Sequence, residues 1–390
     1  MKVLYSLPHP FDRLGTHQAG HVVRATNLIN AMEECGITVI REEAAAAKST
    51  KNSVGLYRRV IKNLLPKRLA MMMRDWARVK YSERYANRLI ETIKLHKPDL
   101  ILETHIAFSR AGKIASEKTG IPLVLDDCAP AWEEKQLYGV GLDSIANQIH
   151  REVTNHAKLL VAVNSTLRQY LLDEGISSDK VITIENGIDE KKFHPMVDGK
   201  KWREKYGISE DTVVIVFVGS YQPYHRVDIL LRAFAQLKIN QKVHLLLVGD
   251  GQNFNESVEL ARELKISSLV SFVGRTPYDI VPSYIAAGDI AVMPATNSYG
   301  NPMKIYEYLA MGLPIAAPLQ PTITEILTHR KNAYLFEPEN VEAVTETLFK
   351  LVDDSNLRKK LAEEGLKLAS KNTWNSRAMI LVNAVQKIIN

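Results

Sequence analysis

Short apolar runs recur along the whole chain, and amphipathic stretches separate them. Runs of this kind, without regular polar alternation, are typical of parallel strands that helices cover on both faces. The pattern predicts a strand at the N-terminus and further strands at residues 100–102, 122–125, 159–163, 181–184, 213–218, 245–248, 270–273, 290–293 and 313–316. Because strands and helices alternate over the full length, we expect the α/β class, with ligands at the carboxyl ends of the strands.

A single sheet of that many strands is improbable, so we expect the chain to divide. The polar stretch from Asp189 to Lys205 contains a proline and a glycine, and it separates two series of strands. We therefore predict two doubly wound domains, 1–188 and 189–372, with a ligand site in the cleft between them. The amphipathic segment 373–390 is either an ordinary terminal helix or a helix that crosses back to the first domain.

The composition is that of a folded protein. Hydrophobic residues make up 46% and charged residues 24% of 390 positions, which excludes a disordered chain, a collagen and a disulfide-stapled mini-protein. The two cysteines, Cys35 and Cys128, form no Cys-x-x-Cys motif, so we expect two buried thiols. No apolar run reaches the roughly 18–20 residues that span a bilayer, and the N-terminus lacks the pattern of a signal peptide. These features predict a cytoplasmic protein.

The formal charge of +6 is concentrated in one stretch. Residues 48–97 hold 14 Lys and Arg against three acids, a net +11, so the remaining residues carry −5. This stretch also has apolar residues at helical spacing, interrupted near Pro66: Ile61, Leu65, Leu69, Met72, Trp76 and Val79. Two interpretations stay open, namely a core-facing helix with a solvated face, or a surface that meets anionic lipid at the inner face of a membrane or an anionic acceptor. Nucleic acid is not expected, because no recognition motif accompanies the charge.

Two predicted strands lead into loops that suit a phosphate. Gly15–His21 opens a helix over about 21–35, and glycines and a helix N-terminus both favour phosphate binding. The loop lacks a G-x-G-x-x-G fingerprint, which argues against a dehydrogenase. Gly219–Arg226 places His225 and Arg226 at a helix start, where a cation is unfavourable unless an anion lies nearby. The alternative for the first loop is a turn without a ligand, and the alternative for the second is an exposed arginine on a solvated turn.

A third loop leads into the helix that begins near Asn301. Asn301 is predicted to be the N-cap, and Pro302 suits the first helical position. Lys304 and Glu307 are three residues apart and therefore share a face of this helix. They form either a surface ion pair or a site in which Lys304 binds phosphate and Glu307 accepts hydrogen bonds from two ribose hydroxyls.

Several motifs follow one another in the second half of the chain. They are residues 184–189 with 193–195, 217–228, 247–251, 272–275, and 302–314 followed by Glu325. Their order and spacing resemble the donor-binding half of glycosyltransferase family 4. In the first half, Gly20-His21 and residues 120–124 fit the family more loosely.

The resemblance implies a GT-B fold, in which two Rossmann-like domains face each other across a cleft. It implies a retaining transferase that needs no metal and moves a sugar from a UDP- or GDP-type donor, which is a substrate and not a cofactor. The acceptor would be a hydroxyl of a glycan, a glycolipid or a small molecule, in polysaccharide, glycolipid or natural-product synthesis. Two alternatives stay open: a non-catalytic subunit that binds sugar nucleotides, and a GT-B epimerase.

The resemblance also implies site residues. The donor side comprises Gly20, Gly219, His225, Arg226, Gly249, Arg275, Asn301, Met303, Lys304 and Glu307. The catalytic candidates are Asp127, His105, Arg226 and Lys304, and the acceptor side comprises His21 and Asp127. Fixed hydrogen-bond donors near the phosphates would stabilise the leaving group. The sequence shows no paired carboxylates that would indicate a two-step route. The leaving phosphate itself is therefore expected to take the proton of the acceptor.

Three positions depart from the family pattern. Tyr299 stands where the family has a second glutamate, Ser220 and His225 replace an arginine–lysine pair, and Cys128 replaces a histidine. The adjacent residues Asp126 and Asp127 would face opposite ways in a strand and form no metal clamp, so no metal is expected. Asp127 would either orient the acceptor or cap the following turn.

Overall fold

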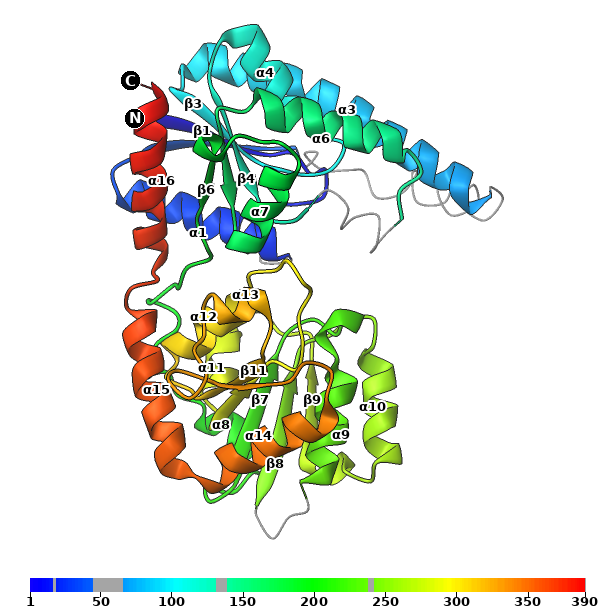
Figure 1. Ribbon diagram of the computed structural model, residues 1–390, viewed down its shortest axis with the longest axis vertical. Helices are drawn as coiled ribbons and strands as arrows, with labels where there is room; N and C mark the ends of the chain where they lie inside the picture. The colour runs from blue at the N-terminus through cyan, green and yellow to red at the C-terminus, as the bar shows by residue number, and fades with distance from the viewer. Residues whose placement is uncertain (17–18, 45–65, 131–138, 238–241, 390) are drawn as a thin grey trace. The chain divides into compact units, whose positions relative to one another are not determined.

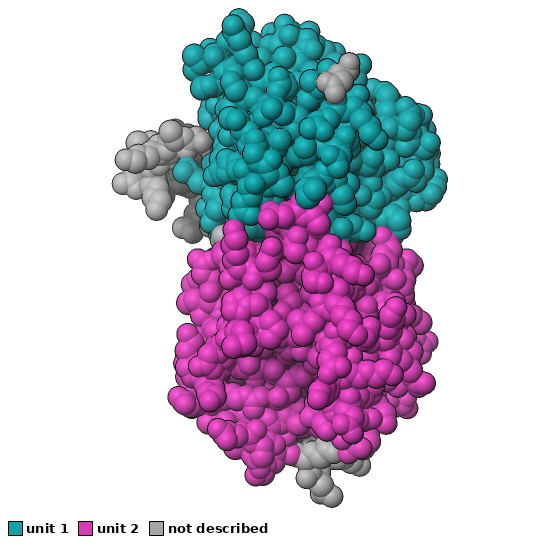
Figure 2. Space-filling view, turned by 90° about the vertical axis from the view of Figure 1, so that its left-hand side faces the viewer, with its two compact units in different colours: residues 1–185, 377–390 teal, residues 186–376 magenta. Residues whose placement is uncertain are grey.

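The chain forms two compact units, each described here by itself. The computed structural model describes residues 1–16, 19–44, 66–130, 139–237 and 242–389. Unit 1 comprises residues 1–185 and 377–390, and unit 2 comprises residues 186–376 (Figure 2). The stretch 189–205, which the sequence suggested as a linker, is part of unit 2. There Phe193 is buried and Trp202 stacks on Tyr284 with ring centroids 3.9 Å apart.

Unit 1 contains a six-stranded parallel sheet with the order β2-β1-β3-β4-β5-β6. The strands are β1 (Lys2–Leu7), β2 (Thr38–Glu43), β3 (Leu100–Thr104), β4 (Leu123–Asp127), β5 (Leu159–Ala162) and β6 (Val181–Thr183). The helices of this unit are α1 (Gly20–Glu34), α3 (Lys67–His96), α4 (Ala111–Thr119), α6 (Asp143–His156) and α7 (Ser165–Asp173) (Figure 1). The terminal helix α16 (Trp374–Ile389) lies in unit 1 from Arg377 onward. The order of the strands reverses between β1 and β3, which makes this point a natural ligand site.

Unit 2 contains a second six-stranded parallel sheet, with the order β12-β11-β10-β7-β8-β9. Its strands are β7 (Val213–Val218), β8 (Val243–Val248), β9 (Val270–Gly274), β10 (Ile290–Val292), β11 (Ile315–Pro318) and β12 (Tyr334–Phe336). Its helices are α8 (Lys200–Lys205), α9 (Val227–Gln236), α10 (Phe254–Glu263), α11 (Val281–Ile285), α12 (Met303–Ala310), α13 (Pro321–Thr324), α14 (Val341–Asp353) and α15 (Ser355–Ala369). The order reverses between β7 and β10, as in a dinucleotide-binding sheet.

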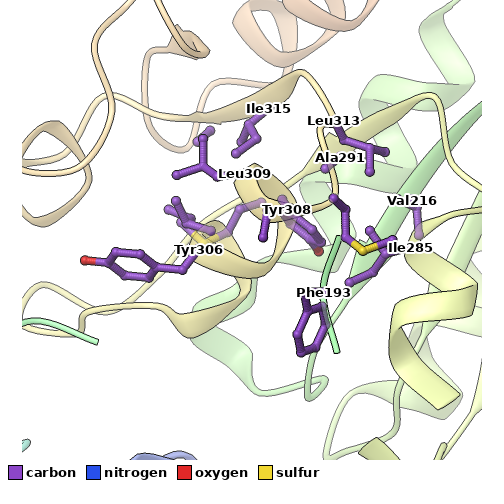
Figure 3. Close-up of a cluster of buried hydrophobic side chains, with 14 of the residues drawn as sticks. Phe193, Val216, Ile285, Ala291, Tyr306, Tyr308, Leu309, Leu313 and Ile315 are labelled. Carbon is purple, nitrogen blue, oxygen red and sulfur yellow. The ribbon is translucent and has the colours of Figure 1, made fainter. Parts of the chain in front are cut away.

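Apolar layers cover both faces of the unit 2 sheet. Val214 and Val216 of β7 join one cluster of buried residues, and their neighbours Ile215 and Phe217 join the other. Alternate residues of a strand face opposite ways, so an uninterrupted apolar run is what two covered faces require. In the first cluster, Tyr308 and Leu309 of α12 lie among residues of the neighbouring strands (Figure 3). This packing fixes the orientation of α12, which carries Lys304 and Glu307.

The predicted α/β class and the predicted strands are confirmed, but two strands were missed. These are β2 and β12, and each lies at an edge of its sheet. β2 reads TVIREE and has no fully buried residue, as an edge strand with one unpaired side allows. β12 is apolar but only three residues long. The prediction of two buried thiols was wrong: Cys35, which follows the last turn of α1, is exposed, and Cys128 is only half-buried.

The basic stretch does not form the single stripe that the sequence suggested. Ile61 and Leu65 lie outside the described residues, and α3 begins directly after Pro66. Val79 is buried, whereas Leu69, Met72 and Trp76 are exposed, so the expected stripe is divided between two sides of the helix. No helix in the described ranges is long and apolar enough to cross a membrane.

Candidate active site

Lys304 lies in the first turn of α12, beside the carboxyl end of β7. Its Nζ is 3.1 Å from Nε2 of His225 and 4.8 Å from the ring centre of Phe217. A Cβ at Gly219 would lie 2.4 Å from the same nitrogen, so the missing side chain makes room for the ammonium group. Burial lowers the pKa of Lys304 to about 7. The site therefore contains a cation that a bound anion would stabilise.

The ring of His225, which contacts Lys304, is neutral. Its Nδ1 donates to the carbonyl oxygen of Ser220, which leaves Nε2 as the acceptor that faces Lys304. Burial and the charge of Lys304 together lower the pKa of His225 to about 3. The sequence suggested that His225 donates to a phosphate, but both ring nitrogens are already engaged. In this arrangement His225 positions Lys304.

Glu307 lies one turn further along α12 and is buried. The side chain of Tyr278 donates a hydrogen bond of 2.7 Å to Oε1 of Glu307. Burial raises the pKa of this carboxyl to about 7. Because Glu307 is only 8% exposed, the alternative of a surface ion pair with Lys304 is wrong. Tyr278 was missed by the sequence reasoning, since it lies in a short 3-10 helix, Tyr278–Ile280, that belongs to no recognised motif.

The ends of three adjacent strands meet through glycines. Gly249, after β8, has φ +131°, and a Cβ there would lie 1.9 Å from the carbonyl oxygen of Gly219. The amide of Gly249 donates to the carbonyl oxygen of Gly274 at the end of β9, and the exposed Arg275 follows. Only glycine allows this close approach of backbones. The candidates Gly219, Gly249 and Arg275 therefore lie along one edge of the unit 2 sheet.

Arg226 and Asn301 have other partners than the sequence suggested. Arg226 pairs with Asp228 at 3.0 Å and with Glu339 at 3.4 Å, so the anion that its position requires is supplied by the protein itself. Asn301 is not the N-cap, because α12 begins at Met303 and is preceded by Pro302. Instead, Oδ1 of Asn301 accepts a hydrogen bond of 2.9 Å from the amide of Asn186. This contact makes Asn301 an internal brace of unit 2.

The unit 1 candidates lie near the carboxyl ends of β3 and β4 and at the start of α1. Gly20 is the first residue of α1, and the ring of His21 contacts the carboxylate of Asp12. Nδ1 of His105 is 3.0 Å from Oδ1 of Asp127, whose side chain is 1% exposed. The ring of His105 stacks on that of His150 with centroids 5.1 Å apart. The turn-cap alternative for Asp127 concerns a segment of which residues 131–138 lie outside the described residues, and the described contact of its side chain is with His105.

Asp126 faces away from Asp127, as the strand alternation predicted. Arg24 of α1 donates to both carboxylate oxygens of Asp126 and to the carbonyl oxygen of Ile184, and all three contacts are buried. Arg24 was also missed by the sequence reasoning; its spacing of four residues from Gly20 on the same helix is the signal that could have found it. Within the described ranges, no three His, Cys, Asp or Glu side chains gather as a metal site.

Two family models together match most of the chain. The model described as "Glycosyltransferase Family 4" matches residues 19–192, and the one described as "Glycosyl transferases group 1" matches residues 198–368. The chain belongs to glycosyltransferase family 4. It is therefore an enzyme that uses a nucleotide-sugar donor, and the predicted GT-B fold is confirmed by similar structures.

The similar structures align over almost the full length. A glycosyltransferase from Rickettsia africae has a TM-score of 0.73 and 18% identity, covering 100% of this chain and 98% of that one. Sucrose-phosphate synthase from Thermosynechococcus elongatus has a TM-score of 0.76 and 14% identity, with 100% and 99% covered. HepE of Anabaena, in complex with UDP and glucose, has a TM-score of 0.73 and 18% identity, with 99% and 100% covered. At these identities the likeness shows the fold.

Curated relatives match at low identity. The N-acetyl-alpha-D-glucosaminyl L-malate synthase of Bacillus anthracis is 26% identical over 57% of this chain and 58% of its own length. A D-inositol 3-phosphate glycosyltransferase of Catenulispora acidiphila is 25% identical over 78% of this chain and 75% of its own length.

Proposed function

We propose that this glycosyltransferase binds the nucleotide diphosphate of its donor at the β7 edge of unit 2 and transfers the sugar, with retention, to an acceptor hydroxyl. The observation that carries the proposal is the pairing of Lys304 and Glu307 on one turn of α12. A cation and a carboxylate, both moved to a pKa of about 7 by burial, lie beside the strand-order reversal at β7. Perturbed groups of this kind gather at functional sites.

Lys304 is assigned to the diphosphate. The neutral ring of His225 positions its ammonium group. A bound anion raises the pKa of Lys304, so the group becomes fully charged and its hydrogen bonds to the phosphate become stronger. As the bond between sugar and phosphate breaks, negative charge grows on the leaving group, and a cation already in place stabilises it without reorganisation. Arg226 contributes at longer range, since its charge is shared with Asp228 and Glu339.

Glu307 is assigned to the ribose of the donor. An ionised carboxylate accepts hydrogen bonds from two neighbouring hydroxyls. Tyr278 donates to Oε1 and so orients the group. The exposed Arg275 and the backbone at Gly249 are assigned to the nucleotide base, and Met303 at the start of α12 to the sugar. Uracil is the first base to test, because the similar structure of HepE contains UDP.

The acceptor is assigned to unit 1, near His21 and the His105–Asp127 pair. Asp127 holds Nδ1 of His105, and the other ring nitrogen, Nε2, is assigned to orient a hydroxyl group. The leaving phosphate takes the acceptor proton, so His105 acts by orientation. The relatives are named for L-malate and D-inositol 3-phosphate, two small hydroxyl compounds that carry negative charge, and these are suitable first acceptors.

A donor screen followed by a turnover assay tests the proposal. We expect a UDP-sugar to raise the melting temperature of the wild type and to release UDP faster when the acceptor is present. The variant Lys304→Gln should lose both effects. Lys331→Gln, at an exposed position of the same unit, is the matched control. Failure of UDP-, GDP- and ADP-sugars alike to bind would refute the donor site, and product without any acceptor would indicate epimerisation in place of transfer.

A further inference from the structure

The first turns of α3 carry an apolar stripe on the outside of unit 1. Leu69, Met72, Met73 and Trp76 follow the spacing of one helix face, and 43%, 36%, 54% and 51% of these residues, respectively, are exposed. Four large apolar residues together on one face differ from the scattered single ones that any surface has. Figure 1 shows this end of α3 extending away from the strands of unit 1.

The rotation of the helix is set by its opposite, inward side. Asp75 is fully buried and accepts hydrogen bonds from the amides of Gly141 and Leu142, at 2.7 and 3.3 Å. The helix and this segment are in close contact, since a Cβ at Gly141 would lie 2.4 Å from the amide nitrogen of Met72. A buried carboxylate with two backbone donors does not leave its site easily. The apolar stripe therefore cannot turn inward to join the core.

Basic residues border the stripe. Residues 67–80 contain five Lys and Arg and a single acid, the buried Asp75, which pairs with Arg74. Arg78 donates to the carbonyl oxygen of Ala107, so the cations at the stripe are Lys67, Arg68 and Lys80. Nζ of Lys80 lies 5.1 Å from the ring centre of Trp76, and Lys80 also pairs with Glu83 on the surface. Lys67 and Arg68, at the exposed start of the helix, have no ion-pair partner among the residues that the structure describes. The surface thus combines exposed apolar side chains with net positive charge.

We propose that this face of α3 binds the surface of an anionic lipid bilayer. A helix that presents Leu, Met and Trp beside Lys and Arg meets both needs of that interface, where apolar groups enter the acyl boundary and cations contact the headgroups. Tryptophan in particular suits the interface, because its ring is apolar and its N–H is polar. A second copy of the chain would place the same positive charges against each other, which disfavours self-association through this face. The inference does not depend on the proposed donor site.

Vesicle co-sedimentation of the full chain tests the inference. We expect binding to vesicles of phosphatidylcholine with about one third phosphatidylglycerol, much weaker binding to phosphatidylcholine alone, and loss of binding as salt screens the charges. Trp76→Ala should weaken the partition coefficient at least tenfold. Lys67→Gln with Arg68→Gln should weaken it about 25-fold, since each basic residue contributes a factor of about five.

Matched controls distinguish binding through this surface from non-specific binding of the protein to vesicles. Phe349→Ala removes an aromatic side chain that is 53% exposed on α14, and Lys359→Gln with Lys360→Gln removes two adjacent exposed charges on α15. Both controls should bind vesicles like the wild type, and circular dichroism should show all variants folded. Equal binding to neutral vesicles, unchanged binding by the α3 variants, or a Trp76-dependent dimer in sedimentation velocity without vesicle binding would each overturn the inference.

Discussion

Replacing Glu307 by glutamine is expected to stabilise unit 2 at alkaline pH and to weaken the binding of the donor. The carboxyl has a pKa of about 7 in the folded protein instead of 4.5, because burial disfavours its charge. The unfolded chain therefore ionises first, and the contribution of Glu307 to the stability of the wild type falls as pH rises from 4.5 to 7 and is constant above. This difference corresponds to about 3 kcal/mol. The glutamine side chain does not ionise, so the variant avoids this cost. Its net gain in stability is smaller by the attraction between Glu307 and Lys304 that it loses.

Donor binding should change in the opposite direction. Two ribose hydroxyls that donate to a carboxylate contribute about 1.5–3 kcal/mol each, and a neutral amide retains part of one such bond. We expect a loss of about 2 kcal/mol, which is about thirtyfold in Kd. Isothermal titration calorimetry with a UDP-sugar at pH 7.5 measures this loss, and scanning calorimetry at pH 5 and pH 8 measures the gain in Tm.

Glu346→Gln, at an exposed position of α14, is the matched control. Its Tm and Kd should follow those of the wild type at both pH values. Unchanged donor affinity in Glu307→Gln would refute the assignment of Glu307 to the ribose. A Tm that falls at pH 8 as much as at pH 5 would refute the argument that burial of an ionised carboxylate costs stability there.

Three further predictions concern other parts of the molecule. Donor affinity of the wild type should fall above pH 7, up to tenfold per pH unit, because the unliganded Lys304 then loses its proton; calorimetry at rising pH measures this, and an affinity that stays constant above pH 7 would contradict it. Gly249→Ala should cost more than about 3 kcal/mol in urea unfolding, because its Cβ would overlap the carbonyl oxygen of Gly219; a loss under 1 kcal/mol would contradict this. Asp126→Asn should cost about 3–5 kcal/mol in the same assay, since it leaves the buried Arg24 charge uncompensated, and an unchanged midpoint would argue against it.

The site was predictable where its residues are close in sequence. Lys304 and Glu307 are three residues apart, and their shared helix face follows from the helix period alone. The roles of Asn301 and His225 were not predictable in this way. Asn301 bonds to Asn186, 115 residues away, and His225 meets Lys304 across 79 residues. No local pattern contains such pairs, because they form only when the strands of unit 2 lie side by side.

Local sequence by itself determined the α/β class, the position of most central strands and the helix that carries Lys304 and Glu307. These follow from the spacing of apolar residues, which depends only on neighbours along the chain. Tertiary structure decided which side chains are charged. Burial and the charge of Lys304 make His225 neutral, and Tyr278 reaches Glu307 across 29 residues. Tertiary structure also decided that Leu69 and Trp76 are exposed while Val79 is buried. Apolar residues at helical spacing mark one face of a helix, but they do not tell whether that face lies against the core or toward solvent.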